Sequence, residues 1–310
     1  ARGAGRPAVC GATTLRIDLG AATVTSDGIT LSEGDTVSVN GRTGDVYAGA
    51  VPIRPAEPSP ELEVLLGWAD EIRQLGVRTN ADNAEDAATA FRLGAEGIGL
   101  CRTEHQFLGD QLPLVQRLVL AENEAEEIEA IAALTAAQQS DFTDLLRVVG
   151  DRPITVRLLD APLHEFLPSD GHYRDDAQAE RAAATHESNP MLGLRGARFA
   201  MVQTRLYPAQ AEALFRAWVT VNAEGLTPAL EVMIPLVSLP GELTEAIAQV
   251  HRAAETVAAD TGVTVPYLVG SMIETPRAAL LAAPLAAEAQ FLSFGTNDLT
   301  QLTYGFSRDD

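Results

Sequence analysis

The chain has 310 residues, 46% of them hydrophobic, so it is long enough to bury one large core or two medium ones. Its 22 basic and 43 acidic residues give a formal charge of −21, which argues against a nucleic-acid partner and against an anionic membrane surface. The sequence contains no lysine, which excludes a Walker A lysine and a Schiff-base lysine. Any bound anion must be held by arginine, by backbone amides or by metal.

The sequence carries no signal for export or for membrane insertion. It has no run of eighteen or more apolar residues, and residues 1–7 lack the apolar segment of a secretory signal. Cys10 and Cys101 are far apart and have no metal-binding spacing, so we expect two free thiols. These features predict a cytoplasmic protein without a membrane partner.

The first part of the chain is predicted to be rich in β structure. Short β segments with turns run from about residue 17 to residue 50, and Asn40-Gly41 between two of them is a hairpin signal. Residues 51–60 contain repeated prolines, which resist both helix and sheet and therefore indicate a linker. We expect a domain boundary there, with one domain over residues 1–60 and a second over residues 61–310.

From residue 61 onward, short β-rich segments alternate with helical ones. Repeated βα alternation over such a length predicts the α/β class and a TIM-type (β/α)8 barrel. The helices include residues 83–93, 210–222 and 241–261. The strand candidates are residues 77–81, 97–101, 154–159, 191–196, 230–235, 267–273 and 291–294. Because these are seven strands and a barrel closes with eight, we expect the last βα unit to lie beyond this sequence.

Charged and polar residues follow most of these predicted strands, at the positions where barrel enzymes carry their functional groups. The arginines are Arg78, Arg102, Arg157 and Arg195, and the carboxylates are Glu274 and Asp298. Guanidinium groups match phosphate and carboxylate oxygens in two-point hydrogen bonds. We therefore expect an anion site at the carboxyl ends of the strands.

Glu274 and Asp298 follow consecutive predicted strands, so two carboxylates can share one ion there. A hard cation such as Mg²⁺ takes oxygen ligands, including one or two protein carboxylates. Gly295, Thr296 and Asn297 precede Asp298, where a glycine permits close approach and backbone N–H groups can bind an anion. The alternative is a pair of helix-capping or solvated acids. The position of both at strand ends favours a metal site.

The remaining polar residues give weaker signals. The five histidines are isolated from nucleophiles and from metal-ligand partners at any known spacing, so none is assigned a catalytic role. Glu104 is the best candidate for a base, although a partner for a neighbouring arginine is the preferred interpretation.

Several segments resemble the signature blocks of the pyruvate phosphate dikinase family, which uses phosphoenolpyruvate (PEP). They are VRTNAD (77–82), GIGLCRTEHQF (97–107), VRLLDAPLHEFLP (156–168), NPMLGLRG (189–196), EVMIPLV (231–237), GSMIETPRAAL (270–280) and FLSFGTNDLTQLTYGFSRDD (291–310). PEP synthase and enzyme I of sugar transport share the Glu and GTND elements. The resemblance covers nearly all of residues 61–310.

The resemblance implies a set of site residues in the PEP/pyruvate-binding barrel. Glu274 and Asp298 would bind Mg²⁺, and the ligand contacts would come from Arg157, Arg195, Gly295, Thr296, Asn297, Arg102 and Arg308. The interval between Arg157 and Arg195 is shorter than is typical of the family, so the connection between them is expected to differ.

The resemblance extends to the N-terminal part, where VCGA (9–12) and EGDTVSVNGRTGDVY (33–47) resemble the end of a swivelling phosphohistidine domain. The phosphorylated histidine and the general-acid cysteine of the family have no counterpart in these residues. The implied function is Mg²⁺-dependent interconversion of pyruvate and PEP with a phosphohistidine donor. Its partners would be the phosphohistidine domain of the full enzyme and a second copy, dimerising through the barrel.

We therefore expect this chain to bind ligand without turning it over by itself. Three alternatives remain open at this point. The chain can be a non-catalytic PEP-binding module, a protein similar to PEP synthase or enzyme I, or a lyase or aldolase of the related pyruvate-metal barrels, although no base for a lyase is identified.

Overall fold

A computed structural model describes residues 8–41, 43–52, 59–107, 111–167, 173–186, 189 and 191–307. The chain divides into two compact units, Ala1–Leu75 and Gly76–Asp310. Residues 53–58 of the predicted linker (51–60) and Arg308 lie outside the described residues, and the predicted boundary at residue 60 stays a prediction. In the described part of the chain, no helix combines the length and the apolar character needed to cross a membrane.

The first unit is rich in β structure, as the sequence predicts. β4 and β5 pair antiparallel from Val37↔Ala48 to Asn40↔Asp45, which confirms the predicted hairpin. The other strands form a three-stranded antiparallel sheet in the order β1-β2-β3. The elements are β1 (Arg16–Asp18), β2 (Thr23–Ser26), β3 (Ile29–Ser32), β4 (Val37–Asn40), β5 (Asp45–Ala48) and α1 (Pro60–Ile72).

The second unit is built on a parallel sheet of six strands in the order β11-β10-β9-β8-β7-β6. Sequential parallel strands joined by helices are the arrangement of a TIM-type barrel, of which this sheet forms the curved part. The strands are β6 (Arg78–Asn80), β7 (Gly97–Arg102), β8 (Pro153–Arg157), β9 (Ala229–Ile234), β10 (Tyr267–Ile273) and β11 (Leu292–Phe294).

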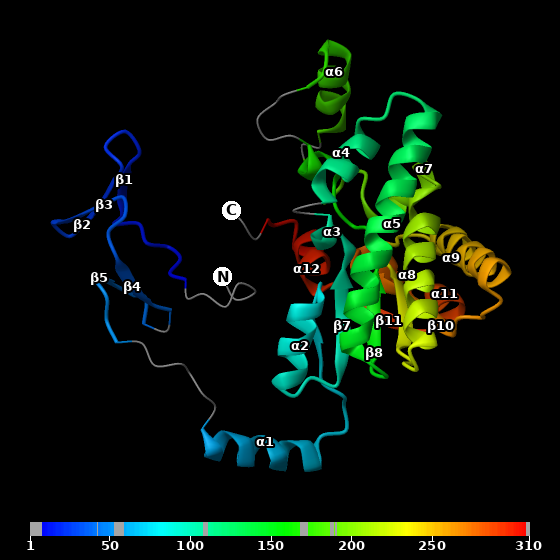
Figure 1. Cartoon of the computed structure of the whole chain (residues 1–310), viewed down its shortest axis with the longest axis horizontal. Helices are drawn as coiled ribbons and strands as arrows, with labels where there is room; N and C mark the ends of the chain where they lie inside the picture. Colours follow the sequence, from blue (N-terminus) through cyan, green and yellow to red (C-terminus); the bar gives the residue numbers. More distant parts are fainter. Residues whose placement is uncertain are drawn as a thin grey trace. The chain divides into compact units, whose positions relative to one another are not determined.

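Helices follow the strands and cover the outer face of this sheet. The long helix α8 packs against both α5 and α9 beside the strands (Figure 1). The helices are α2 (Ala84–Arg92), α3 (Thr103–Gln106), α4 (Leu112–Val119), α5 (Glu124–Val149), α6 (Asp176–Thr185), α7 (Gly196–Val202), α8 (Leu206–Ala223), α9 (Pro240–Thr261), α10 (Pro276–Leu280), α11 (Ala282–Glu288) and α12 (Thr296–Tyr304), with a short 3₁₀ helix, η2 (Leu163–Phe166).

Alternation along the strands separates the core from the site. Ile154 and Val156 of β8 belong to the buried apolar core, where they pack with residues of the covering helices. Thr155 and Arg157 take the alternate positions on the same strand, so they face the inner side of the sheet. The inner face is therefore the polar one, and the functional side chains project from it.

One predicted strand, residues 191–196, is wrong. These residues form turns that lead into α7, with Arg195 as its N-cap. Gly196 has a φ of +56°, in the left-handed region that strands do not use. Moreover, β8 pairs directly with β9, from Pro153↔Ala229 to Arg157↔Met233, which leaves no place for a strand between them. The sheet of the described residues therefore has six strands instead of seven.

Candidate functional site

A pocket of ≈1370 Å³ opens at the carboxyl ends of the parallel strands. It gathers every predicted site residue except Arg78, which does not line it, and Arg308, which lies outside the described residues. The residues brought together are Arg102, Arg157, Arg195, Glu274, Gly295, Thr296, Asn297 and Asp298. They come from strands and loops spread over most of the second unit, and the sheet places them at one edge.

Three carboxylates meet on one side of this pocket. Asp160, Glu274 and Asp298 each offer an oxygen, and these oxygens lie within 4.8 Å of one another. Glu274 directly follows β10, and Asp298 lies in the first turn of α12 just after β11. Because β10 and β11 pair in parallel from Ser271↔Leu292 to Ile273↔Phe294, the two acids leave neighbouring strand ends. This adjacency is the one that the sequence predicted.

Glu274 is buried and closely packed. It is only 1% exposed, and its Oε1 accepts a hydrogen bond of 2.6 Å from the backbone N–H of Leu236. A Cβ on Gly295 would lie 2.6 Å from the Cβ of Glu274, so only glycine fits there. Burial, followed by the negative charge of Asp160, raises the pKa of Glu274 to about 8. A cation beside this carboxylate would oppose both effects.

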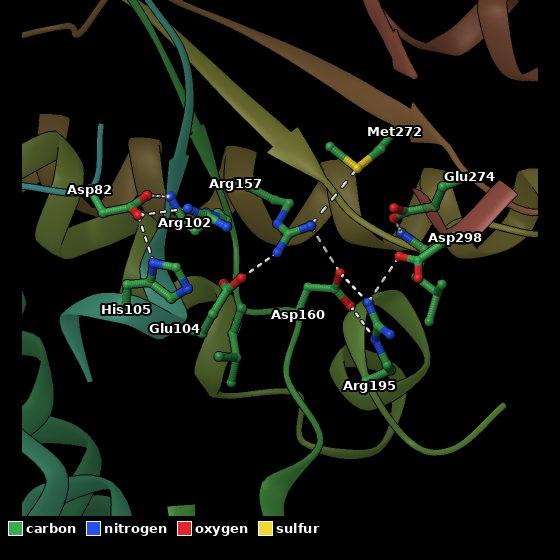
Figure 2. Close-up of polar contacts among 12 residues, drawn as sticks. Asp82, Arg102, Glu104, His105, Arg157, Asp160, Arg195, Met272, Glu274 and Asp298 are labelled. Carbon is green, nitrogen blue, oxygen red and sulfur yellow. Dashed lines mark hydrogen bonds and ion pairs between the residues drawn. The ribbon is translucent and has the colours of Figure 1, made fainter. Parts of the chain in front are cut away.

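Asp160 holds two of the predicted arginines in place (Figure 2). Its Oδ1 and Oδ2 accept two hydrogen bonds of 2.8 Å from Arg195, and its Oδ2 lies 3.0 Å from Nη1 of Arg157. Arg195 also reaches Oδ2 of Asp298 at 3.3 Å. Nη2 of Arg157 pairs with Glu104. The arginines and the carboxylates thus form one continuous network.

Electrostatics keeps both arginines charged despite their burial. Burial opposes the charged form of Arg157, but the carboxylates of Asp160, Glu104 and Glu274 outweigh it and raise its pKa. The pKa of Arg195 is also raised, because its hydrogen bonds and charge interaction with Asp160 outweigh the opposing effect of burial. Burial raises the pKa of Glu104 in turn, although Arg157 opposes that rise. The site therefore presents fixed positive charge next to carboxyl groups that bind protons readily.

The start of α12 adds backbone donors to the pocket. Thr296, Asn297 and Asp298 are its first three residues, and the first N–H groups of a helix have no partner within the helix. The N–H of Gly295 instead donates to the carbonyl of Ile273 at 3.0 Å, so it is not available to a ligand. The pocket thus offers the amides of the residues after Gly295 to an anion.

A second polar cluster lies at the ends of β6 and β7. Asp82 accepts hydrogen bonds from the backbone N–H of Arg102 at 2.7 Å and from its Nη2 at 3.1 Å. Nδ1 of His105 lies 2.6 Å from the same carboxylate. Arg102 and His105 both line the pocket. His105 is therefore not isolated, contrary to the sequence-based prediction.

Sequence reasoning missed two acids and misplaced one arginine. Asp160 and Asp82 were not chosen for the site, although each follows a predicted strand as the chosen residues do. Glu104 was expected to be an arginine partner, and its pairing with Arg157 confirms that. Arg78, expected with the other arginines, begins β6 and pairs with Glu231 at 2.7 Å instead of lining the pocket.

The residues present fit a divalent cation. The two clusters together hold five carboxylates, Asp82, Glu104, Asp160, Glu274 and Asp298, and three arginines, Arg102, Arg157 and Arg195. Oxygen donors in excess of the positive charges are what a hard cation requires. The raised pKa of Glu274 points to the same need for positive charge.

Comparison with known proteins identifies the family. Residues 57–310 match the family described as "PEP-utilising enzyme, PEP-binding domain". The whole chain is 42% identical over 323 residues to the chloroplastic pyruvate, phosphate dikinase 1 of Arabidopsis thaliana and covers 34% of that protein. It is 43% identical over 322 residues to the pyruvate, phosphate dikinase of Rhizobium meliloti and covers 36% of it. The chain thus spans about a third of the length of these relatives. With 254 matched positions that include every described residue of the pocket, the chain belongs to the family of PEP-utilising enzymes through their PEP-binding domain.

Proposed function

We propose that this pocket binds PEP and pyruvate together with Mg²⁺, and that it hosts the pyruvate half-reaction of a pyruvate phosphate dikinase. The observation that carries the proposal is the cluster of Asp160, Glu274 and Asp298 beside Arg157 and Arg195 in one pocket. The relatives named above are pyruvate, phosphate dikinases, which favours this function over a lyase or a PEP synthase.

The reaction requires a phosphoryl group to move from a phosphohistidine to the enolate oxygen of pyruvate. The N–P bond breaks, an O–P bond forms, and pyruvate loses a proton from its methyl carbon. Negative charge therefore gathers on the substrate oxygen and on the phosphoryl oxygens, and positioned positive groups stabilise it. In this pocket those groups are the arginines.

Each group of residues has a distinct role in the proposal. Glu274 and Asp298 would hold Mg²⁺, which supplies positive charge next to the developing enolate when it is bound. Arg157 and Arg195 bind the phosphoryl group, and Asp160 fixes both guanidinium groups in position. Thr296 and Asn297 offer backbone N–H groups to the carboxylate of the substrate.

We assign no catalytic acid, base or phosphoryl carrier among the described residues. The proposed activity of this chain by itself is therefore ligand binding, with the phosphohistidine domain of the full enzyme as donor. Dimerisation through the barrel and a cytoplasmic location stay predictions.

Calorimetry with Mg²⁺ and either PEP or oxalate tests the assignment. We expect binding that depends on Mg²⁺ and that Glu274→Ala or Asp298→Ala abolishes, because each removes an oxygen ligand. Glu255→Ala, which changes an exposed acid of α9, is the control and leaves binding intact. Unchanged binding in both site variants would show that the metal lies elsewhere.

A further inference from the structure

The cluster at the ends of β6 and β7 has no role in the function proposed above beyond its arginine. Its centre is Asp82, which is 9% exposed and whose carboxylate accepts hydrogen bonds from both Arg102 and His105. An ionised carboxylate only accepts hydrogen bonds, so Nδ1 of His105 is the donor in the 2.6 Å contact. The other ring nitrogen, Nε2, is therefore the one left for other partners.

Buried amides hold this corner of the pocket rigid. The backbone carbonyl of Asp82 accepts a hydrogen bond of 3.4 Å from Nε2 of Gln106, which is itself buried. Oε1 of Gln106 accepts in turn from Gln138 of α5, which is 1% exposed. The loop after β6 is thereby tied to α3 and α5. His105 is consequently oriented by a network that extends into the core.

His105 turns its remaining nitrogen away from this network. Its side chain is 42% exposed, and it lines the pocket. Nε2 has no hydrogen-bond partner among the described residues. Figure 2 shows one edge of the ring against Asp82 and the other directed away from it. A polar atom that is fixed in place and accessible from the pocket is suited to contact a ligand.

The position of the cluster indicates which part of a ligand it would meet. Figure 2 places Arg157 between this cluster and the three carboxylates. Arg157 pairs with Glu104 and with Asp160. In the proposed function Arg157 binds the phosphoryl group, so a residue on the Asp82 side of Arg157 also lies toward that group.

We propose that His105 is a further ligand-contacting residue, which donates from Nε2 to a phosphoryl oxygen of PEP, and that Asp82 is the positioning residue for His105 and Arg102. The inference rests on the proposed function, because it requires PEP to occupy this pocket. The proposal requires the ring to donate from both nitrogens, with Nδ1–H on Asp82 and Nε2–H on the phosphoryl group.

The test compares two ligands that differ in the phosphoryl group. PEP carries one and oxalate does not, and both are titrated into the whole chain with Mg²⁺ by calorimetry. His105→Asn keeps an amide nitrogen at the position of Nδ1 but removes Nε2. We expect its dissociation constant for PEP to rise about tenfold or more, as for loss of a hydrogen bond to a charged group, while that for oxalate stays unchanged.

Two further variants separate contact from positioning. His105→Gln places an amide donor near the position of Nε2, so it should recover part of the affinity for PEP. Asp82→Asn should weaken PEP binding selectively, because an amide holds Nδ1–H of His105 and the guanidinium of Arg102 less strongly than a carboxylate does. Both variants are measured against oxalate, since a general loss of structure would weaken both ligands equally.

His251→Asn is the matched control. His251 also has its Nδ1 engaged at 2.6 Å, by the hydroxyl of Tyr267, but it lies on α9 outside the pocket. Wild-type affinity for PEP in His105→Asn would overturn the inference, and so would an equal loss of PEP and oxalate. If the wild-type chain binds neither ligand with Mg²⁺, the proposed function itself fails, which is a different result.

Discussion

Glu274 combines deep burial with a carboxyl group that the fold keeps close to other acids. An unfolded glutamate ionises near a pKa of about 4.3, whereas the pKa of folded Glu274 is raised to about 8. Between these values the folded chain retains a proton that the unfolded chain has lost. The contribution of this residue to stability is therefore complete at low pH and is lost as the pH rises toward 8.

This linkage predicts the behaviour of Glu274→Gln, which cannot ionise. The free energy of unfolding of the wild-type chain should fall between pH 5 and pH 8, with a contribution from Glu274 of at most about 1.4 kcal/mol per pH unit. The slope of the free energy of unfolding against pH should be smaller for the variant by that contribution. Urea unfolding at several pH values, without added metal and followed by the fluorescence of buried Trp218, measures both slopes. Identical slopes would mean that Glu274 is already ionised in the fold.

The sequence predicted only some of the single residues that form the site. Glu274 and Asp298 could be found because each follows its own strand directly, and neighbouring strands deliver them together. Asp160 and Asp82 stand in equivalent places, but their importance comes from the arginines that they hold. Asp160 meets Arg195 across 35 positions of sequence, and Asp82 meets His105 across 23. Local patterns carry no information about such pairings.

At the level of elements, the start of α7 packs closely against the loop after β9. Gly196 has a φ of +56°, and a Cβ on it would lie 2.7 Å from the Cβ of Leu236 and 3.0 Å from Oδ1 of Asp160. Leu236 itself has a φ of +55° and donates its N–H to Glu274. The junction thus sets the positions of Arg195 and Glu274 together.

Gly196→Ala should therefore damage both stability and binding. We expect a loss of about 2 kcal/mol or more, from the left-handed backbone and from the clash, and at least tenfold weaker binding of oxalate with Mg²⁺. Gly225→Ala is the matched control, because Gly225 has a φ of +93° and an added Cβ would meet no atom within 4 Å. It should lose about 1 kcal/mol and keep wild-type binding. Normal binding by Gly196→Ala would contradict the claim that this junction positions Arg195 and Glu274.

For the whole molecule, the division into two units predicts two responses to ligand. Trp68 lies in α1 of the first unit, and Trp218 lies buried in α8 of the second, where its Nε1 donates to the carbonyl of Pro228 at 3.0 Å. A ligand that binds only the folded second unit stabilises that unit by about 2.7 kcal/mol at a hundredfold excess over its dissociation constant. The first unit gains nothing from that binding.

Single-tryptophan variants test this difference. Trp68→Phe reports on the second unit and Trp218→Phe on the first, with thermal unfolding followed by fluorescence. Mg²⁺ and oxalate should raise the midpoint reported by Trp218 and leave the midpoint reported by Trp68 in place. An equal shift at both tryptophans would show that the chain unfolds as one cooperative body.

The sequence by itself determined the class of fold, the alternation of strands and helices and the pair of carboxylates on adjacent strands. Those features depend on local hydrophobic periodicity and on strand order, which the sequence displays directly. The tertiary structure decided that residues 191–196 are not a strand, because β8 and β9 pair directly. It also decided which acid holds which arginine, since those contacts depend on strand register and on loop paths between distant residues.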